Sequence, residues 1–269
     1  MSPEALPYAL LILLVELTIG SLWVLLLAQS RGYLAASYVK FGGATVFVLA
    51  AFAFWVAAKT SVGDEVDGYP LDPSYMGEAR LALVLVFALS LPYAILTLRE
   101  WRLPSLAAGA AASIAGLAAV VFLSQVFAIP TWGYAGTLLS LVVGAVSMGM
   151  VLGHWYLVTP RLPEQPLREM TGFLVVVMVV QALLIIPALA LPRDSIVNSV
   201  DTPILENPFF WMRVGGGLAF PMLLAYMPYD SSGVRAMQSA TGLLYIAMAL
   251  VLSGEVLAKG LLFSSAVPN

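Results

Sequence analysis

The sequence predicts an all-α fold of eight transmembrane helices, and three observations support this. Of the 269 residues, 61% are hydrophobic and 10% are charged, whereas a soluble domain is about half apolar and about a quarter charged. The mean hydropathy is +0.95. The apolar residues gather in eight stretches, each close to the roughly 20 residues that cross a bilayer. We therefore expect a polytopic integral membrane protein.

The eight expected spans follow one another in chain order, and prolines mark many of their ends. The spans are 6–29, 42–60, 79–98, 105–128, 134–158, 172–191, 208–227 and 240–262. The prolines at their ends are Pro104, Pro130, Pro160, Pro192 and Pro208.

Other prolines predict irregular backbone. Segment 159–168 holds three prolines in ten residues, so we expect a non-helical loop there. Pro92, Pro187 and Pro221 fall inside spans and could supply helix breaks.

The loop charges predict the orientation in the membrane. The first apolar run follows no positively charged region or cleavage site, so we expect a retained helix. One side carries Arg31, Lys40, Arg99, Arg102, Arg161, Arg168 and Arg235, and the other only Lys59, Arg80, Arg193 and Lys259. The positive-inside rule then predicts a bacterial inner (plasma) membrane protein with both termini extracytoplasmic. The acidic outer loops 61–78 and 192–207 are expected to dock other membrane or extracytoplasmic subunits.

A weak internal periodicity predicts a tandem repeat of four helices plus four. At an offset of 129 residues, Gly20 matches Gly149, Gly43 matches Gly172 and Pro92 matches Pro221. The two halves would be 1–129 and 130–269, within one membrane domain. Internal repeats often place a functional site at their interface.

The composition excludes several kinds of chemistry. The chain has no cysteine, which excludes disulfides, thiol catalysis and iron–sulfur clusters held by this chain. A single histidine, His154, excludes a haem held by two of its own histidines. No basic tract indicates nucleic-acid binding. We expect no metal site and no covalent or metal cofactor, and electron transfer would need metal centres on partner subunits.

Two charged side chains at bilayer depth, Glu16 and Arg213, are the first candidates for function. Glu16 lies ten residues into its span, which is about 15 Å along a helix. It shares a helix face with Gly20 and Trp23, and the glycine would let a neighbouring helix or a flat ligand approach. Glu16 is either a proton-exchanging carboxylate or a neutral side chain that packs helices. Arg213 precedes three glycines and needs an anionic or carbonyl partner.

A third buried charge, Glu255, is expected at a similar depth, so Glu16, Arg213 and Glu255 could meet. They would form either a structural ion pair or a ligand-binding or proton-relay cluster. Lys259 follows Glu255 at i+4 and could pair with it or extend to the outer interface. Gln125, which a one-residue shift of the repeat places opposite Glu255, would be a polar neighbour.

His154 lies among aromatic residues near the cytoplasmic end of its span. Two interpretations stay open. It is either a residue of the interfacial belt or a proton donor to a quinone or substrate.

The first span, LPYALLILLVELTIGSLWVL over residues 6–25, resembles the opening of the membrane anchors of dimethyl sulfoxide and polysulfide reductases. Those anchors are similar in having eight helices in two halves, no haem and a quinol site within the bundle. The resemblance implies quinone as a ligand and a redox complex as the setting. It carries over no individual site residue, and a lone His154 on the cytoplasmic side does not suit a site near the outer face.

Three functions therefore remain. The first is a haem-free, quinone-interacting subunit of a redox complex, which is not a complete enzyme by itself. In it, Arg213 would polarise a quinone carbonyl and Glu16 would exchange the proton. The second is a small-solute or ion transporter. The third is a structural or assembly subunit whose buried charges only hold helices together.

Overall fold

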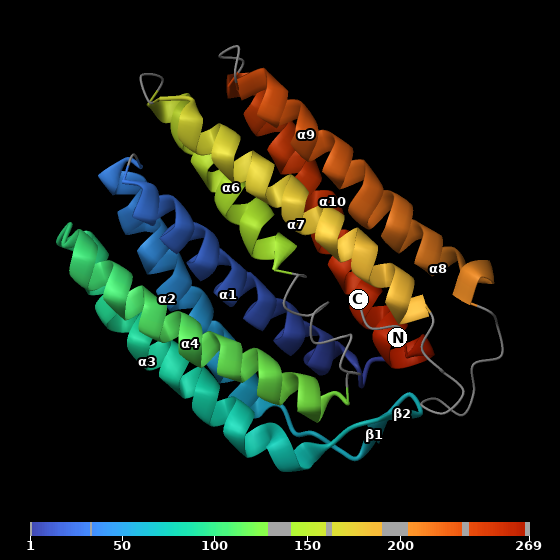
Figure 1. The fold of residues 1–269 in the computed structure, drawn as a ribbon. Helices are drawn as coiled ribbons and strands as arrows, with labels where there is room; N and C mark the ends of the chain where they lie inside the picture. Colours follow the sequence, from blue (N-terminus) through green and yellow to red (C-terminus); the bar gives the residue numbers. More distant parts are fainter. Residues whose placement is uncertain are drawn as a thin grey trace.

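The protein is built almost entirely of long helices with nearly parallel axes (Figure 1). The computed structural model describes residues 2–32, 34–128, 141–159, 163–189, 204–232 and 237–266. Within these ranges the chain forms eight long helical segments and one two-stranded hairpin. The all-α prediction is confirmed.

The first half of the chain forms four helices and a small hairpin at one end. The helices are α1 (Leu6–Arg31), α2 (Ala36–Lys59), α3 (Met76–Leu98) and α4 (Arg102–Val126). Between α2 and α3 lie β1 (Glu65–Val66), β2 (Tyr69–Pro70) and the short 3₁₀ helix η1 (Pro73–Tyr75). The hairpin turns at Asp67 and Gly68, both at positive φ (52° and 78°), as an Asp-Gly turn requires.

The second half also contributes four long helical segments. These are α6 (Val142–Val158), α7 (Gln165–Leu189), a segment running from α8 (Pro208–Trp211) through η3 (Met212–Ala219) into α9 (Phe220–Ser232), and α10 (Met237–Ser265). The 3₁₀ turn η2 (Ile204–Glu206) precedes α8. The segment η3 is π-helical, so its turns are wider than those of the α-helices on either side of it.

Seven of these segments are long and apolar enough to cross a membrane, judged by length and composition. The eighth, α6, has 17 described residues, and the residues just before it lie outside the described ranges. The chain is thus a multi-pass membrane protein.

Several expected boundaries differ from those observed. α7 begins at Gln165, so the expected loop over 159–168 is wrong in its last four residues. The reason is that proline is tolerated in the first turn of a helix, where its missing N–H has no partner to lose. Pro92 does not break its span either, because α3 continues through it. Residues 192–203 of the expected outer loop 192–207 lie outside the described residues.

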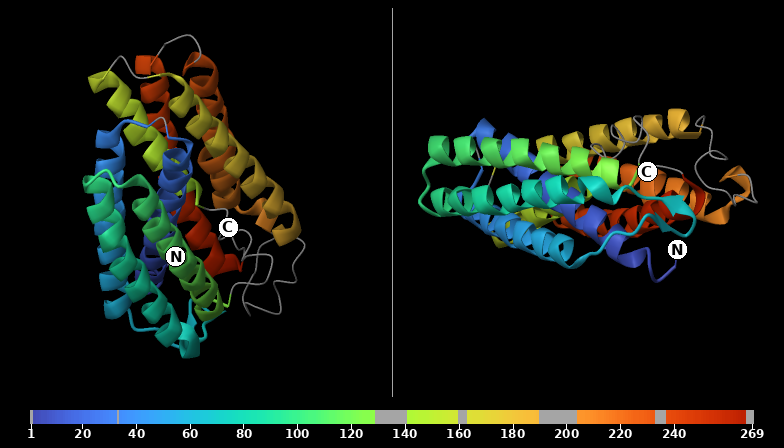
Figure 2. Two further views of the ribbon diagram at one scale, coloured as in Figure 1. Left: turned by 60° about the vertical axis from the view of Figure 1, so that its left-hand side comes forward. Right: turned by 90° about the horizontal axis from the view of Figure 1, so that it is seen from below.

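The two groups of four helices have the same packing order. In each group every helix packs on the next, and the fourth packs on the first. The groups meet chiefly through α1, which packs on α6 and also touches α10. Two further views show the groups side by side, with both termini at one end (Figure 2). α1 is the central helix, since 67% of its apolar window is buried, against 39% to 50% in the other spans.

The central crossing of α1 and α6 depends on two glycines. A Cβ built on Gly20 would lie 2.7 Å from the carbonyl oxygen of Leu141, and one on Gly144 would lie 2.3 Å from the backbone nitrogen of Ser21. The two backbones therefore touch directly. The glycine beside Glu16 serves a neighbouring helix, which is one of the two uses expected from the sequence.

We predict that Gly144→Ala lowers the free energy of unfolding by about 1–3 kcal/mol, because the new methyl group must push α1 and α6 apart. Gly149→Ala is the matched control on the same helix, since a Cβ there meets nothing within 4 Å. It should be neutral or stabilising by up to about 1 kcal/mol. Thermal unfolding in detergent tests both, and equal melting temperatures for the two variants would contradict the prediction.

Candidate site: a buried chain of charged side chains

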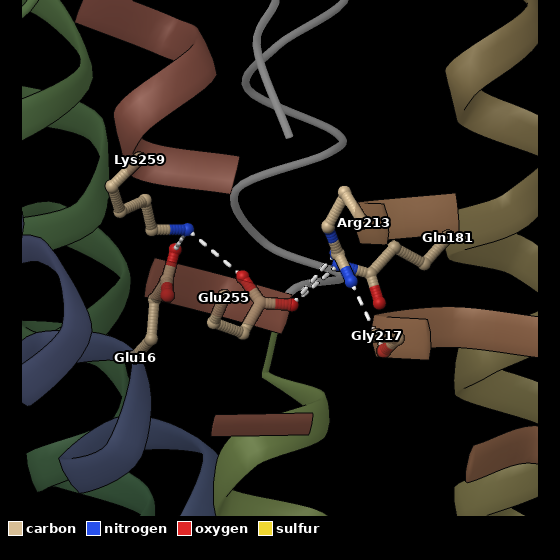
Figure 3. Close-up of polar contacts among 6 residues, drawn as sticks. All are labelled: Glu16, Gln181, Arg213, Gly217, Glu255 and Lys259. Carbon is tan, nitrogen blue, oxygen red and sulfur yellow. Dashed lines mark hydrogen bonds and ion pairs between the residues drawn. The ribbon is translucent and has the colours of Figure 1, made fainter. Parts of the chain in front are cut away.

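Glu255, in α10, is the centre of a buried polar cluster (Figure 3). One carboxylate oxygen, Oε1, accepts hydrogen bonds from Arg213 Nη2 at 2.8 Å and from Gln181 Nε2 at 2.9 Å. The other oxygen, Oε2, accepts from Lys259 Nζ at 3.1 Å. The carboxylate is thus held between two cations and an amide.

Lys259 joins Glu255 to the first half of the chain. It lies one turn further along α10, and its ammonium also donates to Glu16 Oε1 at 2.7 Å. Glu16 comes from α1. One ammonium therefore bridges two carboxylates that are 239 positions apart in the sequence and belong to different halves.

Arg213 is positioned by irregular backbone. It lies in the π-helical segment η3, and its Nη1 donates to the carbonyl oxygen of Gly217 at 3.2 Å. Four residues after Gly217 comes Pro221, which has no N–H with which to form the usual helical hydrogen bond to that carbonyl. The proline therefore leaves an acceptor for the guanidinium, and a π-helical stretch beside it is a frequent feature of functional sites.

Close approach of η3 and α10 brings Arg213 to Glu255. A Cβ on Gly217 would lie 2.4 Å from the Cα of Gly254, and the reverse distance is the same. Only glycine at both positions lets the backbones come this near.

The cluster is buried and electrically balanced. The exposed fractions are 1% for Glu16 and Arg213, 0% for Glu255 and Gln181, and 5% for Lys259. Two carboxylates face two cations, so their charges cancel. Removing such groups from water is costly, and well-packed apolar residues often stabilise a protein equally well. Charges kept at this depth therefore point to a use beyond packing.

Two polar atoms beside Glu255 have no hydrogen-bond partner among the described residues: the donor Arg213 Nε and the acceptor Gln181 Oε1. Both side chains bind the same oxygen of Glu255 through their other nitrogens. Buried polar groups normally have a partner. Within the described part of the chain, the cluster therefore holds one unused donor and one unused acceptor beside Glu255.

Most of the candidate residues from the sequence gather here. Glu16, Arg213 and Glu255 belong to one cluster, although Glu16 reaches Arg213 only through Lys259 and Glu255. The i+4 pairing of Glu255 with Lys259 is present. Lys259 does not extend to the outer interface, because its ammonium turns inward to the two carboxylates.

Gln181 was missed by sequence analysis and takes the place expected for Gln125. The hydrogen bonds described for Glu255 go to Gln181, Arg213 and Lys259, and Gln125 lies on α4, which packs within the first half. The signal available in the sequence was a single glutamine within the apolar part of α7, which indicates a buried polar contact. Its direction toward α10 is set by how α7 packs on α6 and α9.

His154 lies away from the cluster. Its Nδ1 is 3.3 Å from the hydroxyl of Tyr245, and the histidine is exposed. Tyr245 precedes Glu255 by ten residues on α10, about 15 Å along the axis. Trp23 is partly buried and packs against both main apolar cores, which places it as a packing residue of α1.

Across the described part of the chain, no three acidic or histidine side chains gather in a way that could hold a metal ion. No protein-family model, characterised protein or solved structure matches this chain.

We predict that Lys259→Met lowers the free energy of unfolding by about 3–5 kcal/mol, because it leaves the Glu16 carboxylate buried without its cation. Lys40→Met is the matched control, since Lys40 pairs at 2.7 Å with the exposed Glu100. Loss of that surface pair should cost less than about 1 kcal/mol. Denaturant unfolding in mild detergent compares the two variants.

The double variant Glu16→Gln/Lys259→Met should recover part of the loss, because both charges of the broken pair are then gone. A Lys259→Met protein as stable as Lys40→Met, or a double variant less stable than Lys259→Met, would show that the bridge does not stabilise the fold as predicted.

Proposed function

We propose that this chain is a haem-free membrane subunit of a larger redox complex, in which the buried cluster exchanges protons during quinone chemistry. The observation that carries the proposal is the charge-balanced chain Glu16–Lys259–Glu255–Arg213 at the contact between the two halves. Its residues come from helices of both halves, as expected of a site between repeats. The same packing order in both halves supports the proposed four-plus-four duplication.

Lys259 is suited to proton exchange because it serves two acids at once. When one carboxylate takes up a proton, the ammonium keeps its ion pair with the other. Each of the two carboxylates can therefore change its protonation without leaving the lysine unpaired. Oxidation of a quinol releases two electrons and two protons, and the electrons would pass to a partner subunit, because this chain has no cysteine and one histidine.

The expected contact between Arg213 and a quinone oxygen would use only one of the three guanidinium nitrogens. Two of its nitrogens are occupied by Glu255 and Gly217, so the remaining Nε is the donor available to polarise a quinone oxygen. Gln181 Oε1 is the unused acceptor of the cluster and would accept from a quinol hydroxyl. A quinone oxygen that becomes a hydroxyl on reduction matches this pair of atoms.

The membrane orientation belongs to the same proposal. The helix ends that carry Arg31, Lys40, Arg99 and Arg102 lie together at one end of the bundle, and the positive-inside rule makes that end cytoplasmic. Both termini and the hairpin would then face outward, where loops 61–78 and 192–207 would dock the redox partners in a bacterial plasma membrane.

An ion or small-solute transporter is the second candidate. The observation that favours it is the π-helical segment η3 followed by Pro221, since irregular helices that line a site are typical of transporters. A structural subunit is the third candidate, and it predicts that the cluster contributes only stability.

The first test is purification from native membranes in mild detergent, followed by identification of associated proteins and extraction of quinone. We expect iron–sulfur or molybdenum subunits and bound quinone in the same sample. A partner-free and quinone-free protein whose melting temperature responds to a solute would favour the transporter.

We predict that Glu16→Gln lowers proton-coupled quinol turnover of the assembled complex by about 100-fold or more, because an amide cannot exchange a proton as a carboxylate does. Glu100→Gln, on the surface, is the matched control and should leave turnover unchanged. The assembled amount of each complex is measured in parallel. Normal turnover in a fully assembled Glu16→Gln complex would leave the cluster with a structural role only.

A further inference from the structure

A groove runs between the two halves at the end opposite the buried charges. It is a cavity of about 230 Å³ between α1 and α7. Val24, Leu27, Ala28 and Arg31 form one wall, and Pro166, Glu169, Met170 and Phe173 form the other. Each set follows the i, i+3, i+4, i+7 spacing, so each is a continuous stripe along one helix face.

The groove exists because the two four-helix groups pack closely along only part of their boundary. α1 lies along α6, but it touches α7 at only a few positions. The walls are apolar along most of their length: Val24, Ala28 and Met170 are buried to 95% or more, while Leu27 is 41% exposed at the rim. An empty apolar space of this size forfeits packing contacts, and a smaller one of about 150 Å³ already accepts benzene. In a bilayer, the apolar chains that can fill it are those of lipids.

The polar end of the groove carries an exposed ion pair between Arg31 and Glu169. Arg31 Nε lies 3.9 Å from Glu169 Oε2, and the Arg31 side chain is 59% exposed. That distance is too long for a hydrogen bond, so the guanidinium donates none of its N–H groups to a described residue. Glu169 instead accepts from Gln165 Nε2 at 2.8 Å. A planar guanidinium with unused donors matches a phosphate.

We propose that this groove is a binding site for an anionic phospholipid, with an acyl chain between α1 and α7 and the phosphate on Arg31. The groove opens at the arginine-rich end, which corresponds to the cytoplasmic leaflet, where anionic lipids gather. Basic pockets between transmembrane helices on that side are typical sites for such head groups. The lipid completes the contact between the halves where the protein alone leaves a gap. This proposal rests on the membrane orientation proposed above, but not on any role in quinone chemistry.

Native mass spectrometry of the purified protein tests the proposal directly. Delipidated protein is mixed with equal amounts of phosphatidylglycerol and phosphatidylcholine, and bound lipid is counted. We expect phosphatidylglycerol to be retained preferentially, and Arg31→Ala to weaken its binding about fivefold. Arg31→Lys keeps the charge and should bind more tightly than Arg31→Ala.

Arg99→Ala is the matched control, because Arg99 lies at the same end of the bundle over the ring of Trp101 and outside the groove. Its lipid binding should equal that of the wild type. Ala28→Phe fills the groove and should abolish retention even with Arg31 present, and its melting temperature shows whether it is folded. Equal binding of both lipids, equal losses in Arg31→Ala and Arg99→Ala, or bound quinone instead of phospholipid would each overturn the proposal.

Discussion

The ammonium of Lys259, held between Glu16 and Glu255, is the interaction that joins the two halves of this membrane protein. It requires α10 to pass close to α1 at the depth of both carboxylates. The glycine contact between α1 and α6 brings the halves together, and the burial of α1 on all sides keeps water from the ion pairs. In this low-polarity setting each charge depends on its partners, so the four charged side chains act as one unit.

Irregular backbone in the helical segment that runs from α8 to α9 positions Arg213 in the cluster. Pro221 removes one hydrogen-bond donor, the backbone widens into a π-helical segment, and Arg213 binds the carbonyl of Gly217. The glycines at 217 and 254 then let this segment lie against α10. Such irregular backbone is tolerated at membrane depth only where protein or a cavity satisfies its polar groups. The cluster and the irregular helix are therefore two parts of the same arrangement.

The residues of the cluster were predictable to different degrees. Glu16, Arg213 and Glu255 are identified by a general rule, because a charge inside an apolar span needs a partner wherever it lies. Lys259 was ambiguous, since a lysine near a helix end can pair along its helix or extend to the interface. Gln181 carries no charge and sits alone in its span, so its role emerged only from the arrangement of the second four-helix group, in which its amide reaches Glu255 on α10. The loop expected over 159–168 failed at Gln165 because composition does not distinguish a proline in a first turn from one in a loop.

The sequence by itself determined the class of protein, the eight long helical segments, most of their ends and which charged residues fall inside them. These properties follow from local hydrophobicity and from the high cost of charge in hydrocarbon, which each segment carries independently of the rest. The tertiary structure alone decided which charges meet, that Lys259 turns inward, that Gln181 completes the site and that a groove separates α1 from α7. These features depend on the relative rotation and spacing of helices far apart in the chain, which are set by close packing at a few glycines.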